Sequence, residues 1–214
     1  MSTQVTSPVQ KHPQPEEEAN RYSRRNILRS ETMYGEGFQS PGGLRVVEAF
    51  CQKLHMGKGM HILDIGSGLG GASFYFARTY GATVAGLDVS QEMVDISTER
   101  MKHYKLPNIS FRQGDIRTAQ LEQDAFDLAW TRDCILYIAE KNLAWKNVYA
   151  SLKPGGQLFI TDFSKGEGPL SEAFISYLMR CQYHLQNLAS YRLALEVAGF
   201  RDIRIEDNTQ AFID

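Results

Sequence analysis

Short apolar runs alternate with longer stretches in which apolar residues recur every three or four positions, from residue 61 almost to the end of the chain. The short runs predict strands and the longer stretches predict amphipathic helices. The predicted strands cover residues 61–65, 83–88, 109–113, 126–131, 157–161 and 202–206. The predicted helices cover residues 70–80, 91–104, 142–152 and 188–198. This alternation is typical of an α/β protein with a doubly wound parallel sheet.

The chain before the first strand has a different pattern. Residues 1–20 are rich in Ser, Gln, Pro and Glu and hold few apolar side chains, which predicts a flexible tail. Residues 22–33 are compatible with a helix, and apolar residues recur at helical spacing over 44–54. We therefore predict a tail over 1–20, an N-terminal segment over 21–43 and an α/β domain over 44–214.

Composition and charge narrow the class of protein. The chain has 214 residues with a formal net charge of −2, so it has no overall basic field and nucleic acid is disfavoured as a partner. No apolar stretch reaches the roughly 18 residues of a membrane span, and the N-terminus lacks a signal-peptide core. Three cysteines cannot all pair, and the five histidines show no ligand spacing. We expect a cytoplasmic protein with neither a disulfide framework nor a metal.

The strongest local signal is the segment ILDIGSGLGG over residues 62–71, where an apolar strand meets glycines and then a helix. Glycines let the backbone turn tightly and approach a ligand, and the helix that follows presents free N–H groups. Gly66, Gly68 and Gly71 match G-x-G-x-x-G. That spacing alone leaves dinucleotide binding and simple turn chemistry both open.

Acidic residues at the strand ends favour a nucleotide-like ligand. Asp88 ends the second predicted strand, where a carboxylate can accept both hydroxyl hydrogens of a ribose. Asp115 follows the third strand, within reach of an adenine amino group. Asp64 precedes Gly66 and suits a ligand with a cationic amino-acid end better than one with a pyrophosphate.

The ends of the later strands add candidate residues. Ligands of open α/β sheets bind beyond the carboxyl ends of the strands, so Arg132 and Asp133 are expected to face that crevice. The Pro154-Gly155-Gly156 run is interpreted as a helix stop and a turn.

These motifs together resemble a known family. ILDIGSGLGG, Asp88, GDI, TRD and LKPGG, in this order and spacing, resemble the class I S-adenosylmethionine-dependent methyltransferases over residues 60–207. The chain is most similar to the phosphoethanolamine N-methyltransferases, from Tyr22 through YGEGFQSPGG, TRD and ITDF to EDNT. The resemblance implies a Rossmann-like methyltransferase sheet, with S-adenosyl-L-methionine as the cofactor.

The resemblance also implies a set of cofactor-binding residues. They are Ser40, Asp64, Gly66, Gly68, Asp88, Val89, Asp115, Ile116 and Arg132. In this assignment Asp64 and the two glycines hold the methionine end, and Asp88 holds the ribose. Asp115 and Ile116 flank the adenine. Tyr22 and Ser40 belong to a lid that covers the cofactor and the reacting amine.

For the acceptor, the resemblance implies catalytic roles for Tyr22, Asp133 and Tyr137, and substrate contacts from Arg180 and Tyr183. Asp133 would attract the substrate nitrogen. No metal is implied.

The acceptor half departs from the family pattern. The family has a histidine where this chain has Tyr137, which leaves the general base open, and a tyrosine where it has Phe163. A phosphate-binding arginine of the family falls on Cys181, next to Arg180. The chain stops at Asp214, where the family continues, so the last antiparallel strand is expected to be missing.

The leading hypothesis is an N-methyltransferase acting on phosphoethanolamine or its methylated derivatives, in phosphocholine biosynthesis. One alternative is a methyltransferase for another small amine, an amino acid or a specialised metabolite. A nucleotide-dependent oxidoreductase is disfavoured by Asp64 and by the later motifs. A third class is a non-catalytic cofactor-binding subunit. An open sheet edge would also suit a homo-oligomer.

Overall fold

A computed structural model describes residues 23–210. Its centre is a five-stranded parallel sheet with the strand order β3-β2-β1-β4-β5. The strands are β1 (His61–Ile65), β2 (Thr83–Asp88), β3 (Ile109–Gln113), β4 (Phe126–Arg132) and β5 (Leu152–Thr161). The helices are α2 (Arg24–Tyr34), α3 (Gly43–Cys51), α4 (Gly71–Tyr80), α5 (Gln91–His103), α6 (Lys141–Ser151), α7 (Glu172–Cys181) and α8 (Leu188–Ala198), with the short 3-10 helix η1 (Ile135–Tyr137). The prediction of a doubly wound parallel sheet is confirmed.

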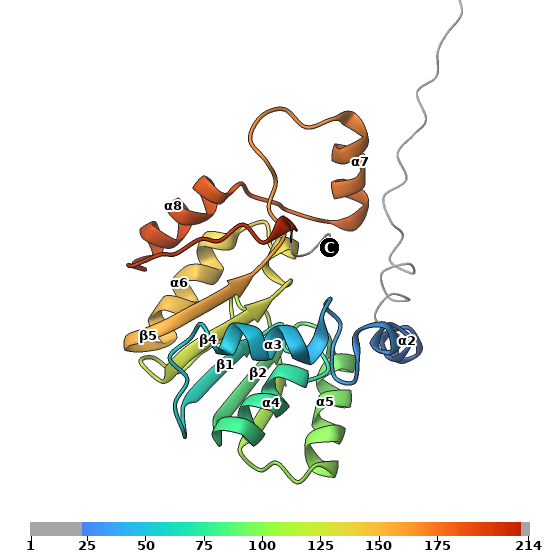
Figure 1. The fold of residues 1–214 in the computed structure, drawn as a ribbon, viewed down its shortest axis with the longest axis vertical. Helices are drawn as coiled ribbons and strands as arrows, with labels where there is room; N and C mark the ends of the chain where they lie inside the picture. Colours follow the sequence, from blue (N-terminus) through green and yellow to red (C-terminus); the bar gives the residue numbers. More distant parts are fainter. Residues whose placement is uncertain (1–22, 211–214) are drawn as a thin grey trace, which may run out of the picture.

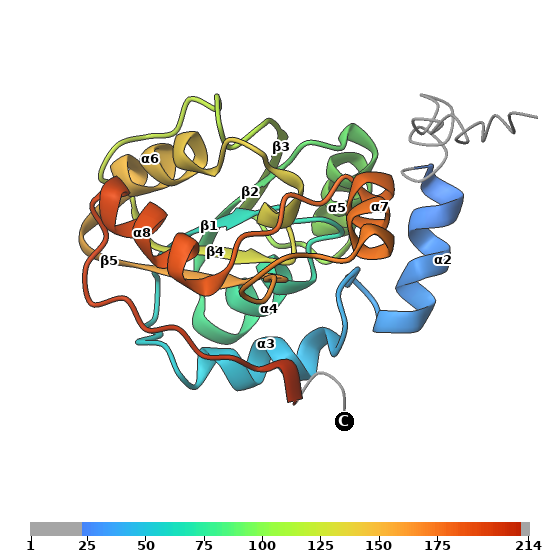
Figure 2. The ribbon, with the colours of Figure 1, turned by 90° about the horizontal axis from the view of Figure 1, so that it is seen from above.

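Helices cover both faces of the sheet, with α6 and α8 on one side and α3 and α4 on the other (Figures 1 and 2). A core cluster that includes Trp145 and Leu195 fills the first side, and a second cluster built around Phe76 and Trp130 fills the other. Because both faces are covered, strands such as β1 are buried along almost their whole length.

The predicted strand over residues 202–206 does not form. The segment after α8 is extended but belongs to no ladder. Phe200 and Ile203 pack their side chains against the core on the α6 and α8 side. The Ile203 carbonyl accepts a hydrogen bond from the Arg192 guanidinium at 3.1 Å, so a side chain takes the place of a neighbouring strand.

The turn predicted at Pro154-Gly155-Gly156 is also wrong, because these residues lie inside β5. Phe126 pairs with Leu152 and Leu128 pairs with Gln157, so β5 carries extra residues at a bulge. Gly155 has a φ of +78°, which glycine adopts without steric cost, and the bulge absorbs the turn.

One α-helix and the short helix η1 were not predicted. Helix α7 starts at the Ser171 cap, whose hydroxyl accepts the Phe174 N–H at 3.2 Å. It stands beyond the carboxyl ends of the strands, apart from the two helix layers (Figure 1). None of its residues is buried, so it adds little to the core.

The N-terminal segment is docked on the domain. Ile27 of α2 is buried against Leu69 and Ile96, and the Glu31 carboxylate accepts two bonds from the Arg100 guanidinium of α5, at 2.5 and 2.9 Å. Tyr22 and the tail predicted over 1–20 lie outside the described residues. Within residues 23–210, no helix is both long and apolar enough to cross a membrane.

Candidate functional site

The glycine-rich loop closes tightly over the ends of β1 and β2. The backbone N–H groups of Gly66 and Ser67 both donate to the Leu87 carbonyl, at 2.8 and 3.1 Å. Gly66 has a φ of +69°, and a Cβ atom there would lie 2.4 Å from the Cys134 sulfur. Only glycine fits this position, because the turn and the close packing both exclude a side chain.

Gly68 is different, because a Cβ atom there would meet nothing within 4 Å. Its N–H donates to the Asp88 Oδ2 atom at 2.8 Å, and the Ser90 N–H donates to Oδ1 at 2.9 Å. Burial raises the pKa of Asp88, while these backbone N–H groups act in the opposite direction. The carboxylate is thus held in one orientation beside open space, and each oxygen keeps a lone pair for a further donor.

Asp64 is the buried acid of the site, with 3% of its surface exposed. Its Oδ2 atom accepts the Ser73 hydroxyl at 2.6 Å. Burial first, and then the charge of Asp88, raise the pKa of Asp64, whereas Ser73 and Arg132 act to lower it, and the net result is a pKa of about 6. A cationic ligand group close to this carboxyl would favour its ionised form.

Arg132 connects the sheet to the N-terminal segment. Its guanidinium donates to the Pro41 carbonyl at 2.9 Å and to the Gly43 carbonyl at 3.4 Å. Its buried Nε atom has no hydrogen-bond partner. The half-buried Ser40 lies in the same turn. Burial lowers the pKa of Arg132, although the charges of Asp133 and Asp64 oppose that shift.

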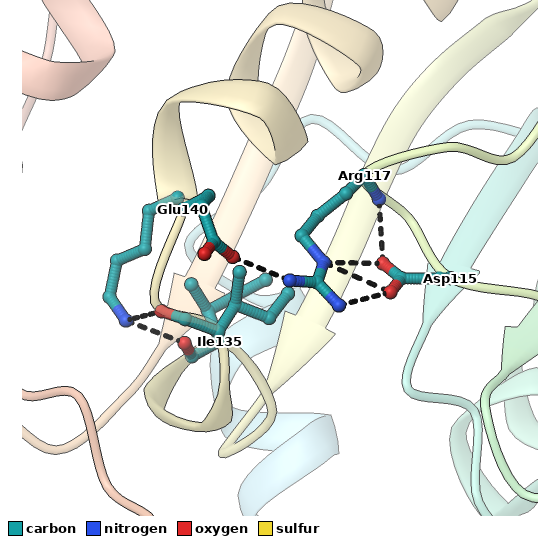
Figure 3. Close-up of polar contacts among 6 residues, drawn as sticks. Asp115, Arg117, Ile135 and Glu140 are labelled. Atoms are coloured by element: carbon teal, nitrogen blue, oxygen red, sulfur yellow. Dashed lines mark hydrogen bonds and ion pairs between the residues drawn. The ribbon is translucent and has the colours of Figure 1, made fainter.

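Asp115, predicted to face adenine, is already paired. The Arg117 guanidinium binds both of its carboxylate oxygens, with Nε 3.1 Å from Oδ1 and Nη2 2.6 Å from Oδ2, and also donates to Glu140 at 2.5 Å (Figure 3). Arg117 lowers the pKa of Asp115. The Ile116 side chain is 4% exposed and packs into the core, whereas Val89 is 62% exposed. An adenine contact from Asp115 would have to use a remaining lone pair.

Three of the predicted acceptor residues, Asp133, Tyr137 and Tyr183, lie at or next to η1. Asp133 has a φ of +49°, and its N–H donates to the Thr161 carbonyl at 2.8 Å. The Tyr137 ring meets the Tyr183 ring edge to face, with centroids 5.2 Å apart. Arg180 lies on the exposed surface of α7 with its guanidinium 5.8 Å from the centre of the Tyr177 ring.

The structure also brings in three residues that the sequence analysis missed. Asp162 follows β5, Lys141 begins α6 and Tyr191 lies in α8, and all three make hydrogen bonds around η1 or to one another. They are far apart in sequence and match no short motif. The ITDF segment was a part of the family resemblance, but nothing in it singled out the aspartate.

Comparison with known proteins defines the class. Residues 56–198 match the methyltransferase domain family. The chain therefore belongs to this family, and the oxidoreductase alternative is set aside.

The individual relatives narrow the family. The phosphoethanolamine N-methyltransferase of Plasmodium falciparum is 31% identical over 193 residues, which is 89% of this chain and 72% of that protein. Phosphoethanolamine N-methyltransferase 1 of Triticum aestivum is 37% identical over 90% of this chain, but the chain covers only 38% of that protein. Within the methyltransferases, the chain is a member of the phosphoethanolamine N-methyltransferase family.

Solved structures agree with this assignment. Haemonchus contortus phosphoethanolamine N-methyltransferase 2, in complex with phosphomonomethylethanolamine and S-adenosylhomocysteine, superposes with a TM-score of 0.87 at 33% identity. The match covers 91% of this chain and 46% of that one. The chain thus spans less than half of the length of several relatives.

Proposed function

We propose that the chain binds S-adenosylmethionine and transfers its methyl group to the amine of phosphoethanolamine or of its methylated derivatives. The observation that carries the proposal is the Asp88 carboxylate, fixed by two backbone N–H groups beside the open space at Gly68, in a chain of this family. A carboxylate at the end of the second strand is the ribose-binding group of doubly wound nucleotide sites.

The residues present fit the cofactor. The open space at Gly68 lets a ligand approach the backbone, and the buried Asp64 provides negative charge for a cationic amino-acid end. The exposed Val89 offers an apolar surface next to Asp88 for an adenine ring. When bound, S-adenosylmethionine supplies an electrophilic methyl group, so the protein has mainly to align the acceptor and exclude water.

The acceptor would lie between η1 and the N-terminal segment. Asp133 would attract the substrate nitrogen in its ammonium form, and the nitrogen must lose a proton before it attacks. Tyr22 and Tyr137 would orient the lone pair, and the lid would close over the site through the turn that contains Ser40. Arg180 and Tyr183 would contact the phosphate.

The rest of the proposal concerns the molecule as a whole. We infer that the free edge of β5 pairs two copies of the chain, because β5 has only β4 as a neighbour among the described residues. Residues 21–43 would act as a lid on the domain over 44–214, after a flexible tail over 1–20. A cytoplasmic location completes the proposal.

The test is methyl transfer to a panel of amines, followed by mass spectrometry of the products. Phosphoethanolamine and its methylated forms are expected to gain 14 mass units per methyl group, roughly the mass of CH₂. Ethanolamine and glycine are expected to react poorly, because they lack the phosphate dianion and the charge-assisted bonds that it makes. Asp88→Ala is the control, and it should weaken S-adenosylhomocysteine binding at least tenfold, by roughly 1.5 kcal/mol or more.

Cys181→Arg sharpens the test, because it places a guanidinium at the position of the family's phosphate-binding arginine, next to Arg180. It should improve reaction with phosphorylated amines alone. If an unphosphorylated amine is the far better substrate and Cys181→Arg makes it worse, the phosphobase assignment is wrong. If S-adenosylhomocysteine binds but no amine reacts, the non-catalytic alternative holds.

A further inference from the structure

Asp162 fixes the short η1 turn from the side of the sheet. Its Oδ1 atom accepts the Leu136 N–H at 3.2 Å and the Phe163 N–H at 3.1 Å. Its Oδ2 atom accepts the Tyr191 hydroxyl at 2.5 Å. One carboxylate therefore joins the end of β5, the middle of η1 and helix α8.

Lys141 binds the two ends of the same turn. Its ammonium group donates to the Ile135 carbonyl at 2.7 Å and to the Ile138 carbonyl at 2.6 Å, and only 2% of the residue is exposed. Figure 3 shows the Ile135 contact at the start of α6. The N–H group inside the turn and the carbonyls at both of its ends thus meet charged side chains, of which Lys141 is buried and Asp162 is half-buried.

A third contact joins the turn to the segment that follows α7. The His184 N–H donates to the Leu136 carbonyl at 2.7 Å. Tyr183, the preceding residue, places its ring against Tyr137. The position of η1 therefore sets the relation between the two tyrosine rings, and the chain reaches η1 directly from Asp133.

Holding a turn with charged side chains costs free energy, because the charges must leave water. Asp162 and Lys141 bind backbone groups rather than each other, and apolar side chains of similar size often give equal or greater stability than buried ions. The charges fix the orientation of the η1 backbone, because each hydrogen bond defines the orientation of one peptide group.

We propose that Asp162 and Lys141 are positioning residues, which fix η1 and so set the orientation of Asp133 and Tyr137 toward the acceptor amine. The assignment rests on the proposed function, because the acceptor site is part of it. Tyr191 supports the carboxylate from α8.

The electrostatic surroundings of Asp162 make the arrangement sensitive to pH. Burial first, and then the charge of Asp133, raise the pKa of Asp162, which is about 6 in the folded protein. The Tyr191 hydroxyl, the Lys141 ammonium and the Leu136 N–H act to lower it, and the buried Cys134 thiol faces the same carboxyl. The pKa of Asp162 in the folded protein lies above the ordinary value of 3.8, so folding favours the protonated form, and the charge that η1 meets at this carboxyl changes near pH 6.

The test compares Asp162→Asn with Asp127→Asn in the full chain. Asp127 is a matched control, because its carboxylate also accepts a backbone N–H, from His61 at 2.8 Å, and a lysine, Lys153, but at the amino ends of the strands. The first readout is methyl transfer to phosphoethanolamine, measured as kcat and KM, with calorimetry of S-adenosylhomocysteine. The second is the ¹⁹F resonance of Tyr137 in protein labelled with 3-fluorotyrosine, assigned through Tyr137→Phe.

Asp162→Asn should lower kcat between tenfold and a hundredfold, roughly the cost of a small misplacement, and leave S-adenosylhomocysteine affinity within about twofold. The Tyr137 resonance should show an inflection near pH 6 in the parent chain and none in Asp162→Asn. Tyr191→Phe should move the inflection to higher pH, because it removes a hydrogen bond that stabilises the carboxylate. This variant tests the positioning role of Asp162 even if Asp162→Asn fails to fold. Asp127→Asn should leave both readouts unchanged.

An unchanged Tyr137 resonance in both Asp162→Asn and Tyr191→Phe would overturn the proposal, as would an equal loss of kcat in Asp127→Asn. The resonance needs no turnover. A parent chain that methylates nothing would therefore refute the proposed function, while the fluorine signal would still decide whether Asp162 holds the turn.

Discussion

The two parts of the candidate site are built in opposite ways. On the glycine side, formed by β1, β2 and residues 66–70, Asp64 and Ser73 are buried and the loop is bonded to β2. On the α7 side, formed by η1, α7 and residues 182–187, α7 contributes no buried residue, and Met179 is 53% exposed. The glycine side is part of the core, whereas the α7 side is attached to it through a few contacts at η1. Substitutions on α7 can therefore change ligand recognition with little effect on the fold.

The largest effect is expected from Gly66→Ala. The positive φ and the overlap with Cys134 should together lower the free energy of unfolding by about 2 to 5 kcal/mol. Gly68→Ala is the matched variant, with a φ of +52° but open space around the new Cβ atom. It should lose only about 1 to 2 kcal/mol of stability and mainly weaken S-adenosylhomocysteine binding. Urea unfolding measures the stability of the two variants, and calorimetry measures their affinity for S-adenosylhomocysteine. Equal stabilities would show that Cys134 moves aside freely.

The next effect is the pH dependence of stability. The pKa of Asp64 is about 6 in the folded protein against an ordinary 3.8, so folding favours its protonated form. The stabilisation is complete below about pH 4 and is lost as the pH rises to about 6, which amounts to about 3 kcal/mol. Urea unfolding of Asp64→Asn between pH 4 and 7 should show a flatter curve. Asp162 has a similarly raised pKa on the other side, so a part of the slope should remain until Asp162→Asn is added. A single variant that removes the whole slope would mean that only one of the two acids titrates.

The smallest effect is expected on α7. Met179→Gln should change the free energy of unfolding by less than about 0.5 kcal/mol, because the side chain is already in water. Met93→Gln, at a residue 6% exposed in α5, should cost about 2 kcal/mol or more. Urea unfolding of both variants tests the contrast directly. A large loss in Met179→Gln would show that α7 packs against a further surface.

The difference between the two sides also decided what the sequence could predict. Strands β1, β2 and β3 match their predicted bounds, because apolar residues mark each short segment and a glycine or a polar residue ends it. Helix α7 has apolar residues at helical spacing, such as Phe174, Tyr177 and Leu178, but they cover no core, and the sequence analysis assigned no helix to this segment. Ile203 and Ile205 alternate as in a strand, but a strand also needs a partner, and the sequence cannot supply that information. Asp162 was missed for a similar reason, since its partners come from η1 and α8.

The strand order has a consequence for how the chain folds. The hydrogen bond between Gly68 and Asp88 joins residues 20 positions apart, whereas that between His61 and Asp127 joins residues 66 positions apart. Closing the longer segment costs about 1 kcal/mol more in chain entropy. We expect β1, β2 and β3 to assemble first from nearby chain, and β4 to add later on the other edge of β1. During synthesis, the glycine-rich loop would then form before the tyrosines of η1 and α7 have a surface to pack against.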